Sequence, residues 1–272
     1  MTHLEELTAE RIRWAGLAGR AHGNPDRTAG AFVLLHGLTF DRHMWDPVLD
    51  ALPEDRRAIA FDLPGHGGSR ALDRPGLEPA VDAIHEAVLD AGVEAPIVVG
   101  HSIGGPLATI YAATHEASGV VVVDAPLRFE PFAAQLRAHR EQLSGDDFDA
   151  VWEPYRRSMR LDLLTAGQRR LLRAGDHASR DVVLGYQHDL LEVPLDEVLR
   201  RRSEGLEALR RKGTPYLALH AKPVDPAESA FVNEGLPQAE LVVWPVWHHF
   251  PHVAAPDRFA VLLTQFAATA CA

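Results

Sequence analysis

Residues 97–105 read Ile97-Val98-Val99-Gly100-His101-Ser102-Ile103-Gly104-Gly105. The β-branched, apolar start is typical of a buried strand, and the glycines around Ser102 mark a sharp turn. Gly-X-Ser-X-Gly at such a turn is the nucleophile-elbow pattern, which holds a serine hydroxyl out of the end of a sheet. A Cβ at position 100 or 104 would collide with the tight backbone crossing, so we expect both positions to require glycine. The helix expected next would point its first amide groups toward negative charge forming beside Ser102.

Patterns typical of further strands recur on both sides of this turn. They lie at 31–35, 58–61, 120–123, 215–219 and 239–244, and an edge strand is expected within 10–22. Apolar residues at helical spacing lie between them, at 79–91, 107–115 and 256–268. Strands that alternate with helices and lack a polar face predict an α/β fold, with a mostly parallel central sheet flanked by helices.

The alternation stops after Pro126, and no strand pattern returns for about 85 residues. This segment is expected to contain helices at 129–143, 146–160, 165–174, 178–191 and 195–211. A helical insertion between two strands of a parallel sheet, on the side where the strands end, predicts a cap over the site. The sequence therefore predicts a core made of 1–126 and 213–272 and a helical cap at 127–212.

Composition and charge exclude several kinds of partner. The formal net charge is −11, which argues against nucleic acid, and the arginines of 200–212 are interleaved with glutamates, as on a solvated helix face. The single cysteine, Cys271, excludes a disulfide framework and a cysteine metal site. The first residues lack the pattern of a signal peptide, and no apolar run approaches a membrane span. We therefore expect a cytoplasmic protein without a membrane partner; the oligomeric state stays open.

Four motifs stand in order, each at the end of an expected strand. They are Leu35-His36-Gly37, Asp62-Leu63-Pro64-Gly65-His66-Gly67, Gly100-His101-Ser102-Ile103-Gly104-Gly105 and His249-Phe250-Pro251-His252. With these motifs the chain resembles the α/β-hydrolase family over roughly 30–125 and 214–268. The resemblance implies that Ser102 is the nucleophile, followed along the chain by an acid and then by a histidine base. It also implies an oxyanion hole made by the backbone amides of Leu38 and Ile103.

The resemblance places the base at His249, because Phe250 and Pro251 follow it as in the family pattern. His248 and His252 stay open as alternatives. A serine hydroxyl is a weak nucleophile until a neighbouring imidazole takes its proton, so one of these rings has to reach Ser102.

The acid is expected at Asp225, in the loop after the strand expected at 215–219. Asp124, at the end of the preceding strand, is the alternative position that some relatives use, and Glu228 is a third. The carboxylate would fix the tautomer of the base and stabilise its charge. Asp62 is expected to order a loop instead.

A serine at the elbow favours attack on a carbonyl carbon and an acyl-enzyme, whereas relatives that open epoxides or displace halide carry aspartate there. The sequence therefore predicts a hydrolase of a carboxylic ester or lactone. The same residues could serve a carbon–carbon hydrolase, thioesterase, acyl transferase or lyase, and a non-catalytic small-molecule-binding protein is a further alternative.

The substrate is expected to be small, apolar and ester-like. The candidate lining residues are aromatic side chains beside the oxyanion loop and in the cap: Phe40, Trp45, Trp152 and Tyr155. No histidine spacing typical of a metal site is present, so neither a metal nor another cofactor is expected.

Overall fold

Eight strands form one sheet in the computed structural model, which describes residues 12–74, 76–176, 179–246 and 248–271. The order across the sheet is β1-β2-β4-β3-β5-β6-β7-β8, and the six strands from β3 to β8 run parallel. The bounds are β1 (Ile12–Trp14), β2 (Leu17–His22), β3 (Phe32–Leu35), β4 (Ala58–Phe61), β5 (Ile97–His101), β6 (Gly119–Val123), β7 (Tyr216–His220) and β8 (Ala239–Val243). The predicted α/β fold with a mostly parallel sheet is confirmed.

The edge strand expected within 10–22 is instead an antiparallel hairpin. β1 pairs with β2 around a turn at Ala15 and Gly16, which both have positive φ. A residue with positive φ reverses the chain, and glycine adopts it without strain. Residues 10 and 11 lie outside the described residues.

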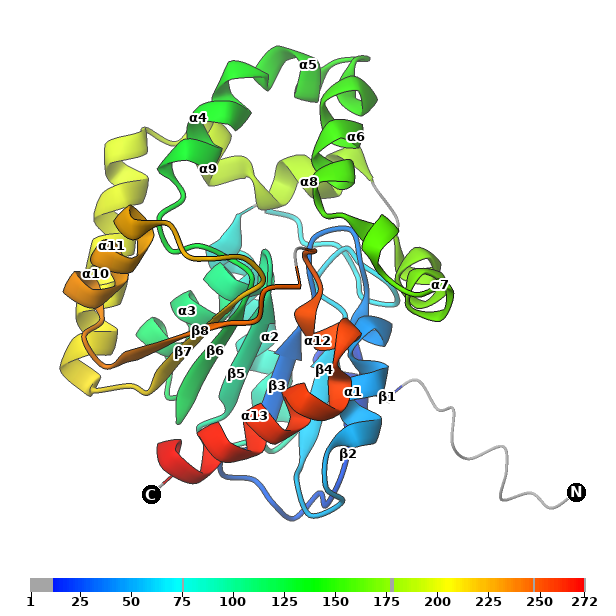
Figure 1. Cartoon of the computed structure of the whole chain (residues 1–272), viewed down its shortest axis with the longest axis vertical. Coiled ribbons are helices and arrows are strands. Elements are labelled where there is room, and N and C mark those ends of the chain that lie inside the picture. Colours follow the sequence, from blue (N-terminus) through cyan, green and yellow to red (C-terminus); the bar gives the residue numbers. More distant parts are fainter. Residues whose placement is uncertain (1–11, 75, 177–178, 247, 272) are drawn as a thin grey trace, which may run out of the picture.

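Helices cover both faces of the sheet (Figure 1). Alternate residues of each strand point to opposite faces, so Val33 and Leu35 belong to one core cluster while Phe32 and Leu34 belong to the other. The first cluster packs under α2 (Leu77–Asp90), α3 (Gly104–Thr114) and α10 (Leu195–Lys212). The second packs under α1 (Asp46–Ala51) and α13 (Pro256–Ala270). Because both faces are buried there, the strands β3, β4 and β6 carry no polar side chain.

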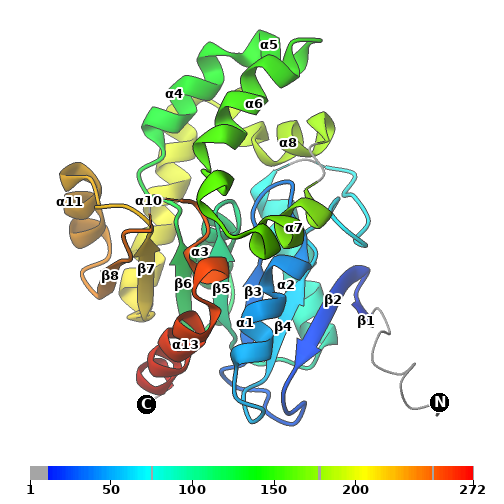
Figure 2. The ribbon, with the colours of Figure 1, turned by 45° about the vertical axis from the view of Figure 1, so that its right-hand side comes forward.

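The segment between β6 and β7 is helical, and both ribbon views place α4, α5, α6 and α8 beyond the same end of the sheet (Figures 1 and 2). Its helices before α10 are α4 (Glu130–Ala138), α5 (Arg140–Ser144), α6 (Phe148–Ser158), η3 (Leu161–Leu163), α7 (Ala166–Gly175), α8 (Arg180–Tyr186) and α9 (His188–Glu192). The helices expected at 129–143 and 178–191 are each divided in two, at His139 and Gln187. The division of the chain into a core and a cap domain stays a prediction.

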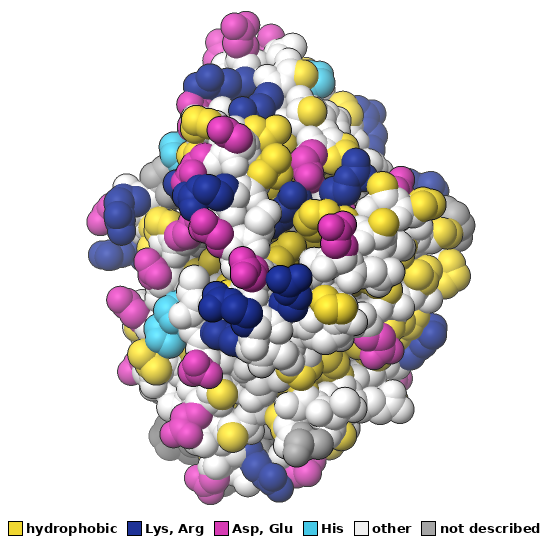
Figure 3. Space-filling model, turned by 90° about the vertical axis from the view of Figure 1, so that its left-hand side faces the viewer, with side chains coloured by type: hydrophobic (Ala, Val, Ile, Leu, Met, Phe, Trp, Pro, Cys, Tyr) yellow, Lys and Arg dark blue, Asp and Glu magenta, His cyan; other side chains and the backbone are white. Residues whose placement is uncertain are grey.

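Charges of both signs alternate along α10, which lies on the left of Figure 1. Arg200 contacts Glu197 and Glu204 at 2.8 and 2.5 Å, and Arg202 reaches Glu130 at 2.9 Å. Acidic and basic side chains are mixed over this side of the molecule (Figure 3). Within the described ranges, no helix is both long enough and apolar enough to cross a membrane.

Candidate active site

Ser102 lies on a strained turn between β5 and α3. Its φ is +53°, a conformation that residues other than glycine rarely adopt, and its N–H donates to the carbonyl of Val123 at 3.0 Å. A Cβ on Gly100 would lie 1.9 Å from the carbonyl oxygen of Gly104, and one on Gly104 would lie 2.5 Å from that of Leu35. The expectation that both positions require glycine is confirmed, and the elbow is rigid.

Two buried histidines hold the loop after β3 against the loop after β4. The Nε2 of His36 accepts the N–H of Leu63 at 2.9 Å, and the Nε2 of His66 accepts the N–H of Thr39 at 3.1 Å. Each ring also lies beside a carbonyl oxygen on its Nδ1 side, so each carries its proton on Nδ1. Burial lowers the pKa of His66 to about 4 and that of His36 well below its ordinary value, so both rings are neutral near pH 7.

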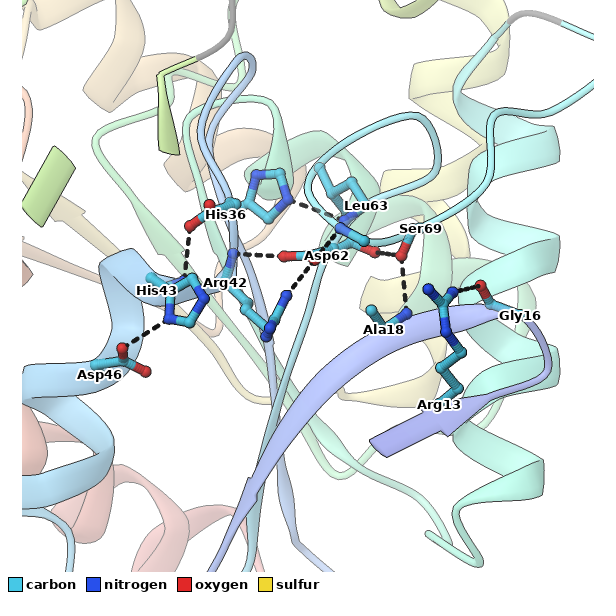
Figure 4. A network of polar contacts seen from close by, with 12 residues as sticks. Arg13, Gly16, Ala18, His36, Arg42, His43, Asp46, Asp62, Leu63 and Ser69 are labelled. Carbon is cyan, nitrogen blue, oxygen red and sulfur yellow. Dashed lines mark hydrogen bonds and ion pairs between the residues drawn. The ribbon is translucent and has the colours of Figure 1, made fainter. Parts of the chain in front are cut away.

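Asp62 orders the same two loops through hydrogen bonds, as expected (Figure 4). Its buried carboxylate accepts the backbone N–H of Arg42 at 2.8 Å and that of Gly68 at 2.7 Å, and it is paired with the Arg42 guanidinium. The Ser69 hydroxyl donates to the Asp62 carbonyl at 2.7 Å and accepts the N–H of Ala18 at 2.9 Å. A buried charge is stable only when paired and hydrogen-bonded in this way, so the network fixes the loop beside Ser102.

The backbone amides of Leu38 and Ile103 come directly after Gly37 and after Ser102. A Cβ on Gly37 would lie 3.3 Å from the Cβ of Ser102, so this loop passes directly beside the serine. Neither amide donates to another of the described residues. Two free N–H groups beside a serine match the requirement for binding an oxyanion.

His249 is paired with Asp124. Its Nδ1 lies 2.7 Å from Oδ2 of Asp124, and the other carboxylate oxygen accepts the N–H of Ala221 at 2.9 Å. Asp124 follows β6 with φ +49°, a conformation that aspartate tolerates better than most residues. Burial alone would raise the pKa of Asp124, but the hydrogen bonds from His249 and from the Ala221 amide hold it below its ordinary value. The carboxylate is therefore charged and orients the ring.

Asp225, the acid expected first, does not contact His249; its carboxylate caps α11 (Pro226–Gly235) by accepting the N–H of Ala227 at 2.7 Å. Asp225 before Pro226 is the ordinary start of a helix, with proline at the first helical position. Glu228, the third alternative, is buried and accepts the N–H groups of Leu127 and Arg128 at 2.7 and 3.0 Å. The structure thus gives Asp124 the position for which Asp225 was expected.

The two other histidines have different surroundings. The Nδ1 of His248 accepts the N–H of Phe250 at 3.1 Å. His252 is fully buried, with its ring centroid 4.4 Å from that of Trp45, and neither of its nitrogens has a hydrogen-bond partner among the described residues. Burial lowers the pKa of His252 to about 3. Trp45 was expected to line the pocket, but it is fully buried in the core beneath the site.

The Ser102 hydroxyl is not hydrogen-bonded to His249 in this structure. The Nε2 of His249 is buried without a partner among the described residues. Burial raises the pKa of the Tyr155 phenol, and the neighbouring Ser102 side chain acts in the opposite direction. Tyr155, from α6, thus faces the serine from the helical segment.

Aromatic rings surround Tyr155 and the oxyanion loop. Trp152 packs on Tyr155 with ring centroids 4.9 Å apart, and the ring centroid of Phe132 lies 5.7 Å from that of Tyr155. Phe40 is buried and packs edge-on against Phe250, with ring centroids 5.3 Å apart. The described residues include no group of three histidine, cysteine, aspartate or glutamate side chains arranged to hold a metal ion.

Comparisons with known proteins agree with this fold. A sequence model described as the alpha/beta hydrolase family matches residues 32–262. The pimeloyl-[acyl-carrier protein] methyl ester esterase of Yersinia enterocolitica is 28% identical over 252 residues, which are 86% of this chain and 92% of that protein. The enol-lactonase of Burkholderia xenovorans LB400 superposes with a TM-score of 0.72 at 18% identity, over 94% of this chain and 99% of that one. A carboxylesterase structure from the thaumarchaeon Nitrososphaera gargenis superposes with a TM-score of 0.71 at 19% identity, over 94% of this chain and 96% of that one. The chain belongs to the alpha/beta hydrolase family.

Proposed function

We propose that this protein hydrolyses a carboxylic ester or lactone through an acyl-enzyme, with Ser102 as nucleophile, His249 as base and Asp124 as acid. The observation that carries the proposal is the 2.7 Å pair between His249 and Asp124, formed at the strand end next to the elbow that presents Ser102. A carboxylate paired with an imidazole, beside a strand end that presents a strained serine, supplies the groups that activate a hydroxyl.

In the first half of the reaction, Nε2 of His249 takes the hydroxyl proton while Oγ of Ser102 bonds to the carbonyl carbon. The carbonyl π electrons move onto its oxygen, and the amides of Leu38 and Ile103 stabilise that negative charge. When the intermediate collapses, the bond to the alkoxy oxygen breaks and His249 returns its proton to that oxygen. The products are an alcohol and an ester of Ser102, and water then releases the acid by the same steps.

Asp124 gives His249 the tautomer that this reaction needs. Because Nδ1–H donates to the carboxylate, the lone pair of the neutral ring is on Nε2, which is free to accept the proton of Ser102. The serine hydroxyl, which faces Tyr155 here, turns about its Cα–Cβ bond to reach His249. Catalytic hydrogen bonds are often long without substrate and shorten in the complex.

The substrate is a small apolar ester in this proposal, and the helical segment 127–212 acts as a cap over it. Leu38 and Leu127 are buried apolar side chains beside the catalytic loops, and Trp152 and Tyr155 add aromatic surface from the cap. Such a lining binds an acyl chain or ring in preference to a charged group. The methyl ester esterase and the enol-lactonase are similar proteins whose names fit the hydrolysis of a carboxylic ester or lactone.

A panel of short-chain and medium-chain p-nitrophenyl esters, lactones and thioesters tests the proposal. The wild-type protein is expected to release p-nitrophenol, and Ser102→Ala is expected to abolish turnover while its circular dichroism spectrum stays unchanged. Equal ester turnover by folded Ser102→Ala protein contradicts the proposal. Turnover of thioesters alone would move the protein to the thioesterase alternative.

A further inference from the structure

His101, the residue before Ser102, contacts the other two catalytic segments. Its ring is fully buried at the end of β5, and its Nε2 lies 2.7 Å from the backbone carbonyl oxygen of His249. A carbonyl oxygen only accepts, so Nε2 carries the proton and donates it. On the other side of the ring, a Cβ on Gly37 would lie 2.8 Å from the bare Nδ1, so the oxyanion loop packs against it.

Aromatic rings fix the orientation of the His101 ring. Its centroid lies 4.6 Å from that of His249, 4.7 Å from that of His252 and 5.3 Å from that of Phe250. Burial, with smaller effects from His249, His252 and His36, holds the pKa of His101 well below its ordinary value. The ring is therefore neutral and has one donor, which is used on the base.

The backbone of the elbow is tightly packed against the sheet. The N–H of Ser102 is bonded to Val123 in the neighbouring strand, and the glycines at 100 and 104 leave no room for displacement. His101 therefore joins a rigid part of the sheet to the loop that carries His249. The N–H of His249 is bonded in turn to the Met159 carbonyl of the helical segment, at 3.0 Å.

We infer that His101 is a positioning residue, which holds the main chain of His249 through its Nε2–H so that the imidazole of His249 stays within reach of Ser102. The inference rests on the proposed function. A displacement of the base by about 1 Å is enough to reduce the rate by about 100-fold, so one hydrogen bond to its backbone is sufficient to matter. Substrate binding does not involve His101, because its ring is buried beneath the site.

Three substitutions separate the hydrogen bond from the shape of the ring. His101→Gln carries an amide N–H as many bonds from Cα as the imidazole Nε2, whereas His101→Asn places it one bond too short and His101→Leu removes it. We expect kcat for the best ester substrate to fall about 10- to 100-fold in the Asn and Leu variants, with KM within about threefold of wild type, and the Gln variant to recover most of the loss. Urea unfolding of each variant checks that the loss of kcat is not caused by a loss of stability.

Wild-type kcat in folded His101→Leu, or equal losses in the Gln, Asn and Leu variants, overturns the inference. If the Leu variant does not fold, the comparison of Gln with Asn decides by itself, because both retain a polar amide. Ser102→Ala, measured in the same assay, separates a failure of the proposed function from a failure of the inference about His101. Activity in Ser102→Ala refutes the proposed function and this inference together, whereas an inactive Ser102→Ala with unaffected His101 variants refutes this inference alone.

Discussion

Replacing Asp124 by asparagine removes the negative charge that faces His249 while the size of the side chain stays nearly the same. The pair is 2.7 Å long, and its side chains are 16% and 18% exposed, so water screens it only partly. Two charges about 4 Å apart at an effective dielectric constant of about 20 attract by about 4 kcal/mol. That attraction forms only when the ring becomes charged in the transition state, and its loss corresponds to about a 1,000-fold fall in kcat. Stabilisation of the wrong tautomer adds to this, toward about 10,000-fold.

The assay is steady-state hydrolysis of a p-nitrophenyl ester, with Asp225→Asn as the matched control. Asparagine caps a helix as well as aspartate does, so the control is expected to retain kcat within about twofold. KM is expected to change little in Asp124→Asn, because the carboxylate does not contact the substrate. If Asp124→Asn keeps a third or more of the wild-type kcat, or if Asp225→Asn loses as much activity as Asp124→Asn, the assignment of the acid is wrong.

Three other perturbations have expected outcomes. His252 has a pKa of about 3 in the folded chain and about 6.5 in the unfolded chain, so the free energy of unfolding falls as pH drops below about 6.5, by up to about 1.4 kcal/mol per pH unit. In urea unfolding across this range, the free energy of unfolding of His252→Phe should depend less steeply on pH than that of the wild type. An unchanged dependence contradicts the reasoning. Gly100→Ala places a methyl group 1.9 Å from the Gly104 carbonyl and is expected to abolish soluble expression or activity, so a wild-type Tm would refute the rigid elbow. Asp176, on the helical segment, is paired with Arg156 and also accepts the Thr39 hydroxyl at 3.3 Å. Thr39→Val removes this hydrogen bond and leaves the ion pair, and it is expected to lower kcat/KM by about 3- to 10-fold, one hydrogen bond's contribution, while leaving the far-ultraviolet circular dichroism unchanged. Unaltered kcat/KM contradicts this link to the oxyanion loop.

Much of the fold could be predicted because it depends on local patterns. Buried strands such as Ala58–Phe61 have no polar side chain, and the glycines at 100 and 104 specify the elbow whatever surrounds it. The hairpin at the edge differs from the single strand expected there, because the positive φ angles of Ala15 and Gly16 reverse the chain. The longer expected helices were divided for a similar reason: His139 and Gln187 end a helix through their backbone angles, and their side-chain types give no signal.

The site was harder to predict, because contacts between distant loops decide it. Three histidine rings lie within five residues. Only the folded loop shows that, among the described residues, His249 is the one of the three that pairs with a carboxylate. Asp225 could have been recognised as a helix cap from the proline and glutamate that follow it. The role of His101 has no sequence signal, since the elbow pattern accepts any residue at that position.

The most direct measurement is the mass of the peptide that contains Ser102 after treatment with diethyl p-nitrophenyl phosphate, which phosphorylates an activated serine much faster than an ordinary one. The account predicts stoichiometric release of p-nitrophenol, one diethylphosphoryl group on Ser102, and strongly slowed labelling in Asp124→Asn but not in Asp225→Asn. An unlabelled Ser102 in folded wild-type protein, or stoichiometric labelling of a different residue, would contradict it.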